Sequence, residues 1–380
     1  MLSGVSTDRD GGNAATGRFG VSRCALEAFR NYEELKVEFS EGLNVLAGPN
    51  AQGKTNLLEA LALVSTTRLL RGQRDSEAIL EGRDRARVHV SLLDGPTELG
   101  MTIERGTRKR ALLNGLELPR ASDLLGRLPS VSVTSEDLEI VRGEPSERRL
   151  FLDLELSSLY PAYLRHLTLY KRALEQRNAL LRAQSWSAAA AYEPWEEQLA
   201  AHGVAIRAQR GAFLARLDAT ARSAHDAIGR GEHLGLAYSP KDEASTAETF
   251  NEHLEQGREE DLHRGATSVG PHRDDVTIDI DERPARLFGS QGQQRTAAMA
   301  LKLGCMEVAR DDLGQPPMLL LDDMLSDLDE LRRERLVELV LSLAGQVVLT
   351  CTEASSAGDR ILSQARVFEV RAGKVLQVSA

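Results

Sequence analysis

The chain has 380 residues, of which 42% are hydrophobic and 27% are charged. Its formal net charge of −10 at pH 7 argues against broad, nonspecific coating of nucleic acid, because phosphate affinity depends on Lys and Arg. The three cysteines lie far apart with no CxxC spacing, so neither a zinc site nor a disulfide framework is indicated, and we predict three buried thiols.

Residues 1–20 are polar and glycine-rich and are predicted to form a flexible N-terminal tail. They lack the apolar segment of a signal peptide. No apolar run reaches the roughly 18 residues that a membrane span requires. We therefore expect a cytoplasmic protein that is not held in a membrane.

The next part of the chain shows short strand patterns. Residues 35–39, 88–92 and 99–103 alternate apolar with polar side chains, which is typical of half-buried strands. Leu43–Ala47 is mostly apolar and ends in a glycine-rich loop, and Asn114-Gly115 is a hairpin-turn signal. These patterns predict an antiparallel lobe that follows a first helix.

The middle of the chain changes to helical spacing. Apolar residues recur at helical intervals over 158–182, with one gap at Arg177, and again over 195–217. A link containing Pro194 separates the two runs, which predicts an antiparallel pair of long helices. About 25 residues would extend roughly 40 Å as an arm. The alternative is a helical subdomain that packs flat on the core.

The last third returns to an α/β pattern. A helix is predicted to begin near Gln293, followed by an apolar strand at Met318–Leu321 and a helix over 329–343. Another strand is expected over 346–352. A hairpin is expected over 367–378. The predicted fold class is therefore α/β, with a helical subdomain inserted between two parts of a sheet-containing head.

The strongest single motif is GxxxxGKT, which follows a strand and opens a helix. Its backbone N–H groups and helix N-terminus can hold phosphate oxygens, and Gly48 and Gly53 allow the backbone to curl closely. Lys54 supplies a positive charge, and the Thr55 hydroxyl can bind Mg²⁺. The predicted ATP-binding residues of this loop are Gly48, Pro49, Asn50, Ala51, Gln52, Gly53, Lys54 and Thr55.

A second acidic motif follows a later strand. Leu319–Leu321 end in Asp322 and Asp323, as a Walker B strand would. Asp322 could hold Mg²⁺, and Asp323 could orient or deprotonate water. Strands often end in acidic turns, so this motif gains weight only beside the phosphate-binding loop.

A polar stretch, SQGQQ, stands before the helix that begins near Gln293. Ser290 can cap this helix, and Gly292 lets another backbone approach closely. A helix N-terminus without acidic side chains is an anion site. Because one loop already serves the nucleotide, we predict that this stretch contacts the γ-phosphate held by a second copy. The alternative is an ordinary cap with a polar loop.

Taken together, these motifs resemble the RecF family of bacterial recombination mediators over residues 21–378. The order of Walker A, SQGQQ, Walker B and SDLD is that of ABC ATPases, while FRNY, EPSERRLFLD, SVGPHRDD and SQGQQRT are typical of RecF. The resemblance implies an ABC-ATPase head with an antiparallel β lobe and a helical arm, related to SMC heads. The implied segments are 1–20, a tail; 21–155, the head with Walker A; 156–262, the arm; and 263–380, the head with signature, Walker B and D-loop.

The resemblance also implies a function. RecF-like proteins dimerise when ATP is bound, bind double-stranded, gapped or junction DNA in that state, and hydrolyse ATP slowly. With RecR and RecO they help RecA to load, which supports replication, repair and the SOS response. The implied cofactors are ATP and Mg²⁺.

Site residues carry over by matching position. Arg30 and Tyr32 are expected to border the adenosine, and the implied catalytic residues are Asp323, Lys54 and Asp322. Thr55 and Asp322 would hold Mg²⁺. The implied signature residues are Ser290, Gln291, Gly292 and Gln293, and those of the D-loop are Ser326 and Asp327.

The sequence departs from ABC transporters in three places. Asp323 stands where they carry Glu, which predicts slow hydrolysis. No switch His follows the strand at 346–349, where the chain has TCTE, so Thr350 or Thr352 substitutes or the role is absent. No Q-loop is assigned, and Gln73 and the Glu136-Asp137 region are the candidates. His272 and Arg273, in the family motif GPHRDD, have no assigned role, and a structural one is the alternative.

Three basic clusters could bind DNA despite the net charge. Arg68, Arg71 and Arg74 have a spacing that would place them near one helix face, and Arg108, Lys109 and Arg110 form a second cluster before a hairpin. The cluster on the predicted arm consists of Arg165, Lys171, Arg172, Arg177 and Arg182. The clusters are arginine-rich with few aromatics, which suits the duplex backbone better than single-strand stacking. The alternative for each is a solvated surface. A transporter motor subunit and a small-molecule kinase are the competing functional classes.

Overall fold

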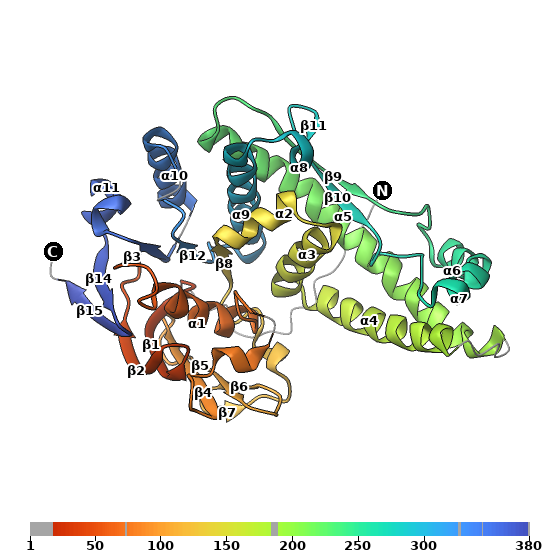
Figure 1. The fold of residues 1–380 in the computed structure, drawn as a ribbon, viewed down its shortest axis with the longest axis horizontal. Coiled ribbons are helices and arrows are strands. Elements are labelled where there is room, and N and C mark those ends of the chain that lie inside the picture. The colour runs from red at the N-terminus through yellow and green to blue at the C-terminus, as the bar shows by residue number, and fades with distance from the viewer. Residues whose placement is uncertain (1–17, 73, 184–188, 326–327, 344, 379–380) are drawn as a thin grey trace.

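The computed structural model describes residues 18–378 apart from 73, 184–188, 326–327 and 344. Figure 1 shows a head built around two sheets, with a helical arm that extends to one side. Residues from both ends of the chain form the head, and the arm comes from the middle, as the α/β prediction with an inserted helical part required. The predicted tail, residues 1–20, lies almost entirely outside the described residues.

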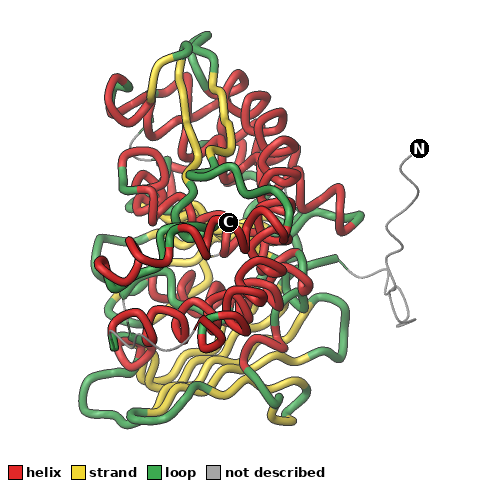
Figure 2. Tube along the Cα trace, turned by 90° about the vertical axis from the view of Figure 1, so that its right-hand side faces the viewer, coloured by secondary structure: helices red, strands yellow, loops and turns green. Residues whose placement is uncertain are grey.

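The first sheet is antiparallel, with strand order β2-β1-β4-β5-β6-β7. Its strands are β1 (Val21–Phe29), β2 (Tyr32–Glu38), β4 (Arg85–Leu92), β5 (Glu98–Glu104), β6 (Arg110–Leu113) and β7 (Leu116–Glu117). The turn at Asn114-Gly115 joins β6 to β7, because both residues have the positive φ that such a hairpin requires. The predicted position of the antiparallel lobe after the first helix holds for β4 to β7, whereas β1 and β2 precede that helix in the chain. Figure 2 shows this sheet along one edge of the molecule.

The second sheet has the order β15-β14-β3-β13-β12-β8. All its pairings are parallel except β14 with β15. The strands are β3 (Leu43–Ala47), β8 (Ser130–Val133), β12 (Met318–Asp322), β13 (Val347–Cys351), β14 (Arg366–Arg371) and β15 (Lys374–Val378). The carboxyl ends of β3, β12 and β13 therefore meet at one edge, where open α/β sheets bind their ligands.

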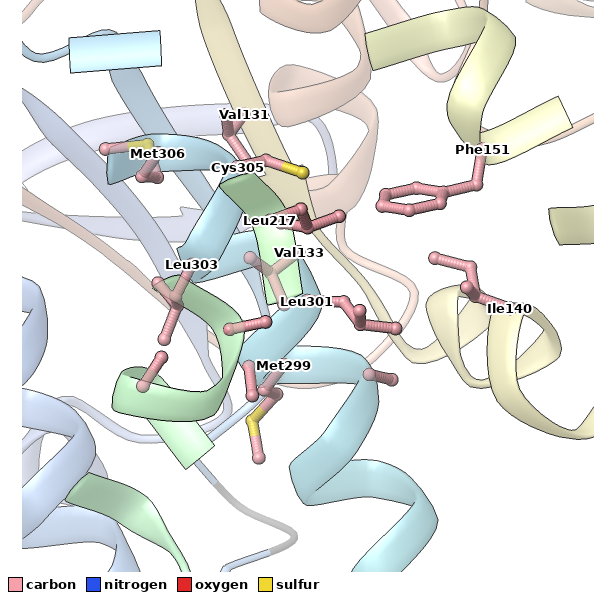
Figure 3. Packing of buried hydrophobic residues seen from close by; sticks show 14 of the residues in the cluster. Val131, Val133, Ile140, Phe151, Leu217, Met299, Leu301, Leu303, Cys305 and Met306 are labelled. Atoms are coloured by element: carbon pink, nitrogen blue, oxygen red, sulfur yellow. The ribbon is translucent and has the colours of Figure 1, made fainter. Parts of the chain in front are cut away.

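Helix α1 (Lys54–Thr66) lies between the two sheets. Successive residues of β12 point to opposite faces, so Met318 and Leu320 pack in the core around α1, while Leu319 and Leu321 pack in a second core. Helix α9 (Gln291–Leu313) covers this other face, and Figure 3 shows its Met299, Leu301 and Cys305 against side chains of β8 and neighbouring helices. All three cysteines are buried and free, as predicted.

The remaining helices of the head are short, apart from α10. They are α2 (Leu138–Arg142), α8 (Ala285–Phe288), α10 (Glu330–Leu343) and α11 (Asp359–Leu362). The strand-to-helix assignments of the last third therefore agree with the sequence pattern to within one or two residues, because buried parallel strands and amphipathic helices leave distinct periods.

The arm contains α3 (Pro145–Leu159), α4 (Pro161–Arg182) and α5 (Glu193–Ile228), followed by α6 (Ala247–Gln256) and α7 (Arg258–Arg264). Helices α4 and α5 form the predicted pair (Figure 1). The chain is not one helix from residue 158, because Pro161 opens a new helix after α3 ends. The far part of α5 packs along α9, so the arm is anchored to the head by one of its own helices.

Arg177, the residue that interrupts the apolar pattern of α4, belongs to a buried ion cluster. Its guanidinium is fully buried and donates to Glu196 at 3.0 Å and to Asp261 at 2.6 Å. Arg177 therefore cannot contribute to the basic arm surface proposed from sequence. Removing one partner of a buried ion pair typically costs about 3–5 kcal/mol of stability.

A small third sheet stands where the arm meets the head. Strand β9 (Leu234–Ser239) pairs with β10 (Asp275–Ile280), which pairs with β11 (Arg283–Pro284). This sheet joins strands on both sides of the predicted boundary between residues 262 and 263. The division into segments at that residue stays a prediction.

Candidate nucleotide-binding site

The glycine-rich loop joins β3 to α1 at the carboxyl edge of the parallel sheet. Gly48 and Gly53 have φ values of 155° and 118°, and Ala51 has 64°, so the loop folds back on itself as only glycine does easily. The Lys54 ammonium donates to the carbonyl of Pro49 at 2.9 Å and also to that of Gly48. Burial lowers the pKa of Lys54, while the carboxylates of Asp323 and Asp322 oppose that shift.

A hollow of about 430 Å³ lies beside this loop. We name it the loop hollow. Its lining is mainly polar, which suits a charged ligand better than an apolar one. The described residues that line it are Asn50, Ala51, Gly53, Lys54, Thr55, Asn56, Arg71, Ser135, Asp322, Asp323 and Thr350.

The predicted acidic pair meets the loop inside the loop hollow. The Asp322 carboxylate accepts hydrogen bonds of 2.8 Å from the hydroxyls of Thr55 and Thr350. Asp323 has a φ of 52°, and its backbone N–H donates to the Thr350 hydroxyl at 2.9 Å. Walker A, Walker B and Thr350 thus form one contiguous group, which sequence reasoning predicted for the first two and left open for Thr350.

The oxygen set at this point fits Mg²⁺. A hydroxyl and a carboxylate lie within hydrogen-bond distance, and Mg²⁺ usually takes one or two protein oxygens and completes its shell with water and phosphate. Among the described residues no group of three or more His, Cys, Asp or Glu side chains could hold a metal ion.

Arg71 lies in the loop hollow rather than with the other basic residues. The prediction that Arg68, Arg71 and Arg74 share a helix face is wrong, because α1 ends at Thr66 and Thr67 turns the chain with a φ of 57°. The Arg71 guanidinium donates to Asn56 at 3.0 Å. Its buried Nε has no hydrogen-bond partner among the described residues. No spacing signal in the sequence distinguishes Arg71 from its neighbours.

Ser135 is a second lining residue that sequence reasoning missed. It follows the carboxyl end of β8, so its position at the ligand edge of the sheet was the available signal. The next residue, Glu136, has its pKa raised chiefly by burial, with the Arg71 charge opposing that shift. Of the two Q-loop candidates, Glu136 thus interacts electrostatically with Arg71 and Asp322 of the loop hollow, although neither it nor Asp137 belongs to the described lining, and Gln73 lies outside the described residues.

Arg30 and Tyr32 do not line the loop hollow, so the structure does not place them against a nucleotide there. The Arg30 guanidinium binds both oxygens of buried Glu59, at 2.7 and 2.8 Å. Tyr32 is fully buried, its hydroxyl donates to the carbonyl of Gly53 at 2.9 Å, and burial raises its pKa. Both side chains support the loop and its helix from behind.

The SQGQQ stretch caps α9. The Ser290 hydroxyl accepts from the backbone N–H of Gln293 at 3.3 Å, and the Gln293 side chain accepts from the N–H of Ser290 at 2.8 Å. This reciprocal pair is a capping box. Of the described residues that line the loop hollow, none belongs to 290–294. Gly292 packs close to Arg332, and the D-loop residues Ser326 and Asp327 lie outside the described residues.

Four of the five basic candidates for DNA binding are exposed. Arg68 and Arg74 border a separate hollow of about 390 Å³ together with Lys109, which forms an ion pair of 2.9 Å with Asp75. Arg165 and Arg172 are exposed on α4. The fifth candidate is Arg71.

The GPHRDD motif, which leads into β10, is held against the helices of the arm. The Nε2 atom of His272 donates to the Thr267 carbonyl at 3.0 Å, and its Nδ1 atom lies 2.6 Å from the Tyr170 hydroxyl. Burial lowers the pKa of His272 to about 4. Arg273 donates to the same carbonyl at 2.9 Å. Asp274 and Asp275 bind arginines of α5 and α3. These contacts favour the structural alternative for the motif.

The chain is similar to known proteins over most of its length. The RecF/RecN/SMC N terminal domain family matches residues 20–374. The DNA replication and repair protein RecF of Symbiobacterium thermophilum is 41% identical over 368 residues, which cover 94% of this chain and 98% of that protein. RecF of Shouchella clausii is 38% identical over 362 residues, covering 92% and 97%.

Solved structures agree with these relatives. The recombination mediator protein RecF of the RecFOR pathway, solved with ATPrS, is 31% identical and superimposes with a TM-score of 0.85 over 96% of this chain and all of that chain. The head of Smc bound to a domain of ScpA shares the fold with a TM-score of 0.56 at 15% identity, covering 94% and 97% of the two chains. The predicted ATPase-head fold is confirmed. No helix in the described part of the chain is long and apolar enough to cross a membrane.

Proposed function

The chain belongs to the RecF family of DNA replication and repair proteins, which has the ABC/SMC-type ATPase fold, and we propose that it is an ATP-dependent DNA-binding recombination mediator. ATP would drive its dimerisation, and the dimer would bind DNA at gaps or junctions. The observation that carries the proposal is the joining of Thr55, Asp322 and Thr350 beside the glycine-rich loop, with the SQGQQ end of α9 outside that hollow.

The loop hollow supplies the groups that a nucleoside triphosphate requires. Residues 48–55 present backbone N–H groups and the positive end of α1 to phosphate oxygens. Lys54 would exchange its bonds to loop carbonyls for bonds to phosphate. Thr55 and Asp322 would hold Mg²⁺, which neutralises charge on the phosphates. The half-buried Arg71 adds a second cation to the lining of the loop hollow.

Asp323 and Thr350 would act on the attacking water. The left-handed backbone of Asp323 turns its carboxylate out of the strand direction, and Thr350 fixes its N–H. Aspartate has a shorter reach than the glutamate of transporters. A carboxylate that holds water less well supports the expectation of slow hydrolysis, in which ATP serves as a conformational switch. Thr350 is then the candidate for the role of the missing switch histidine.

The SQGQQ residues would act on a second copy. Ser290, Gln291, Gly292 and Gln293 stand at an exposed helix end that does not reach the loop hollow of its own chain. Just before them, Leu287 and Phe288 are 73% and 56% exposed. Large apolar side chains exposed beside polar residues are typical of a surface that a partner covers. A symmetric dimer would pair each signature with the opposite nucleotide, with the D-loop residues Ser326 and Asp327 near the interface.

DNA binding would use the exposed arginines. Arg68 and Arg74 border a polar hollow with Lys109, and neither forms an ion pair with any described residue. Arg165 and Arg172 offer a second surface on α4. Each surface would occur twice in a dimer, which gives a physical reason for ATP-dependent affinity. RecR, RecO and RecA as partners, action in the SOS response and a cytoplasmic location rest on the family alone.

The proposal is tested by fluorescence anisotropy of labelled gapped DNA at fixed salt, without nucleotide, with ADP, and with ATP and Mg²⁺. Light scattering on the same samples gives the mass. We expect dimers and tight DNA binding only with ATP, and expect Ser290→Arg to bind ATP yet stay monomeric. The proposal fails if saturating ATP changes neither the mass nor the DNA affinity of the wild type.

The same assay separates the two DNA surfaces. Reversing two charges in Arg68→Glu/Arg74→Glu should weaken DNA binding at least about tenfold and flatten its salt dependence, since each phosphate contact contributes to that slope. The matched variant is Arg165→Glu/Arg172→Glu on α4. Equal affinity of the first variant and wild type would remove the Arg68 surface from the DNA site.

A further inference from the structure

One residue of the glycine-rich loop faces away from the site. The described lining of the loop hollow includes Asn50, Ala51 and Gly53, and Gln52 does not belong to it. The Gln52 side chain instead accepts a hydrogen bond of 2.7 Å from the backbone N–H of Ala372. Its amide nitrogen donates to the carbonyl of Asn50 at 3.3 Å, which closes the loop on itself.

The partner of Gln52 is the turn between β14 and β15, about 320 residues later in the chain. Ala372 and Gly373 both have positive φ, at 45° and 71°, so the turn is tight and directs its N–H groups toward the loop. The N–H of Gly373 donates to the Gln52 carbonyl at 3.1 Å. The C-terminal hairpin thus holds both the backbone and the side chain of one loop residue.

Asn31, in the turn between β1 and β2, holds the same residue from another side. Its side-chain amide donates to the Gln52 carbonyl at 3.0 Å. Its side-chain oxygen accepts from the Asn56 amide at 2.8 Å. The Asn56 oxygen in turn accepts from the Arg71 guanidinium at 3.0 Å. A continuous chain of hydrogen bonds therefore runs from the hairpin turn, behind the loop, to a cation in the loop hollow.

The packing is as close as the hydrogen bonding. A Cβ atom at Gly53 would lie 2.8 Å from the Asn31 amide nitrogen and 2.8 Å from the Tyr32 hydroxyl. A Cβ atom at Gly373 would lie 2.9 Å from the Asn31 carbonyl. Both positions need glycine because the β1–β2 turn and the hairpin turn press on the loop from outside.

We propose that Asn31 is a positioning residue for the phosphate-binding loop. Through Gln52 it sets the curl of the loop, and through Asn56 it sets the place of Arg71, so that N–H groups and guanidinium are aligned before a triphosphate arrives. The inference rests on the proposed nucleotide binding. Asn31 is exposed and forms no part of the core, so its removal leaves no cavity and should change the site rather than the fold.

The test measures the affinity of Asn31→Ala for Mg-ADP and Mg-ATP by calorimetry, together with its steady-state hydrolysis and its melting temperature without nucleotide. We expect the dissociation constants and KM to rise about tenfold, the size of effect that one or two hydrogen bonds carry, with kcat changed less than threefold. The melting temperature should stay within about two degrees of wild type. Glu34→Ala, exposed on the neighbouring strand β2, is the matched control and should bind like wild type.

A second variant tests the same chain of hydrogen bonds. The methionine of Gln52→Met has a shape similar to that of glutamine but cannot accept the hydrogen bond from the Ala372 N–H. Its affinity for nucleotide should therefore fall, as in Asn31→Ala. Because both residues lie on one hydrogen-bond chain, the double variant should lose less affinity than the product of the single losses. Unchanged affinity of Asn31→Ala, or a lower melting temperature alone, would overturn the inference. Absence of nucleotide binding by wild type would instead overturn the proposed function and this inference with it.

Discussion

Two helices in the head, α1 and α9, follow a loop of small and polar residues. The backbone N–H groups at their N-termini are capped differently. At α1 the N-cap is Gly53, no side chain accepts from the first turn, and that turn carries no acidic residue. At α9 the Ser290 and Gln293 side chains already satisfy two backbone N–H groups of the first turn. The α1 end is therefore left open for a phosphate, whereas at the α9 end the chain's own side chains already satisfy part of the first turn.

This difference indicates how affinity is divided between the two ends. The α1 end lies inside a hollow formed by one chain, with a lysine, Thr55 and Asp322 around it. The α9 end is exposed, and a phosphate there would have to come from outside the chain. We expect nucleotide binding by the monomer to depend on the first end, and dimerisation to depend on the second.

The largest expected effect comes from the α1 end. Lys54→Met removes the one charge that the loop curls around, so ATP affinity should fall by at least about a hundredfold, as loss of a partly buried charge pair predicts. Calorimetry with Mg-ATP measures it, and light scattering should then show monomers at any ATP concentration used. Binding within about threefold of wild type would break the comparison, because the α1 end would not be the phosphate site.

A smaller effect is expected at the edge of the same site. Thr350→Val keeps the shape of the side chain but removes the hydroxyl that joins Asp322 to the backbone of Asp323. We expect hydrolysis to slow about tenfold to thirtyfold while ATP affinity changes less than about threefold, since loss of one hydrogen bond to a charged group carries about 1.5–3 kcal/mol. Thr352→Val is the control, because Thr352 does not belong to the described lining of the loop hollow.

Much of the α1 side could be predicted from sequence. The loop motif needs a strand before it and a helix after it, and both have strong periodic signals, so the strand and the helix lie where the sequence predicted and Thr55 meets Asp322. The contacts of Arg30 and Tyr32 behind the loop could not be predicted, because the same short motif can lie in front of a loop or behind it. Only the fold shows that Arg30 binds the Glu59 carboxylate and that the Tyr32 hydroxyl donates to the Gly53 carbonyl. Their contact with adenosine stays a prediction.

The parts that failed or stayed open depend on contacts between distant segments. Arg71 has the spacing of a helical residue, but the helix ends at Thr66, and a left-handed Thr67 is not visible as a pattern in sequence. Arg177 reads as a surface charge until α5 and α7 bring two carboxylates to it. Thr350 could be told from Thr352 only once the strand register put it beside Asp322.

The smallest expected effect separates capping from phosphate binding at α9. Ser290→Ala removes the cap and should lower stability by about 1 kcal/mol, whereas Ser290→Asp keeps a good N-cap and should unfold like wild type. Aspartate nevertheless places a negative charge where the γ-phosphate of a second copy would lie. We therefore expect Ser290→Asp to bind Mg-ATP normally but to remain monomeric in light scattering, while Ser290→Ala still dimerises at higher protein concentration. If Ser290→Asp dimerises with ATP as wild type does, the serine is a cap alone, and the two ends of the head do not meet across a nucleotide.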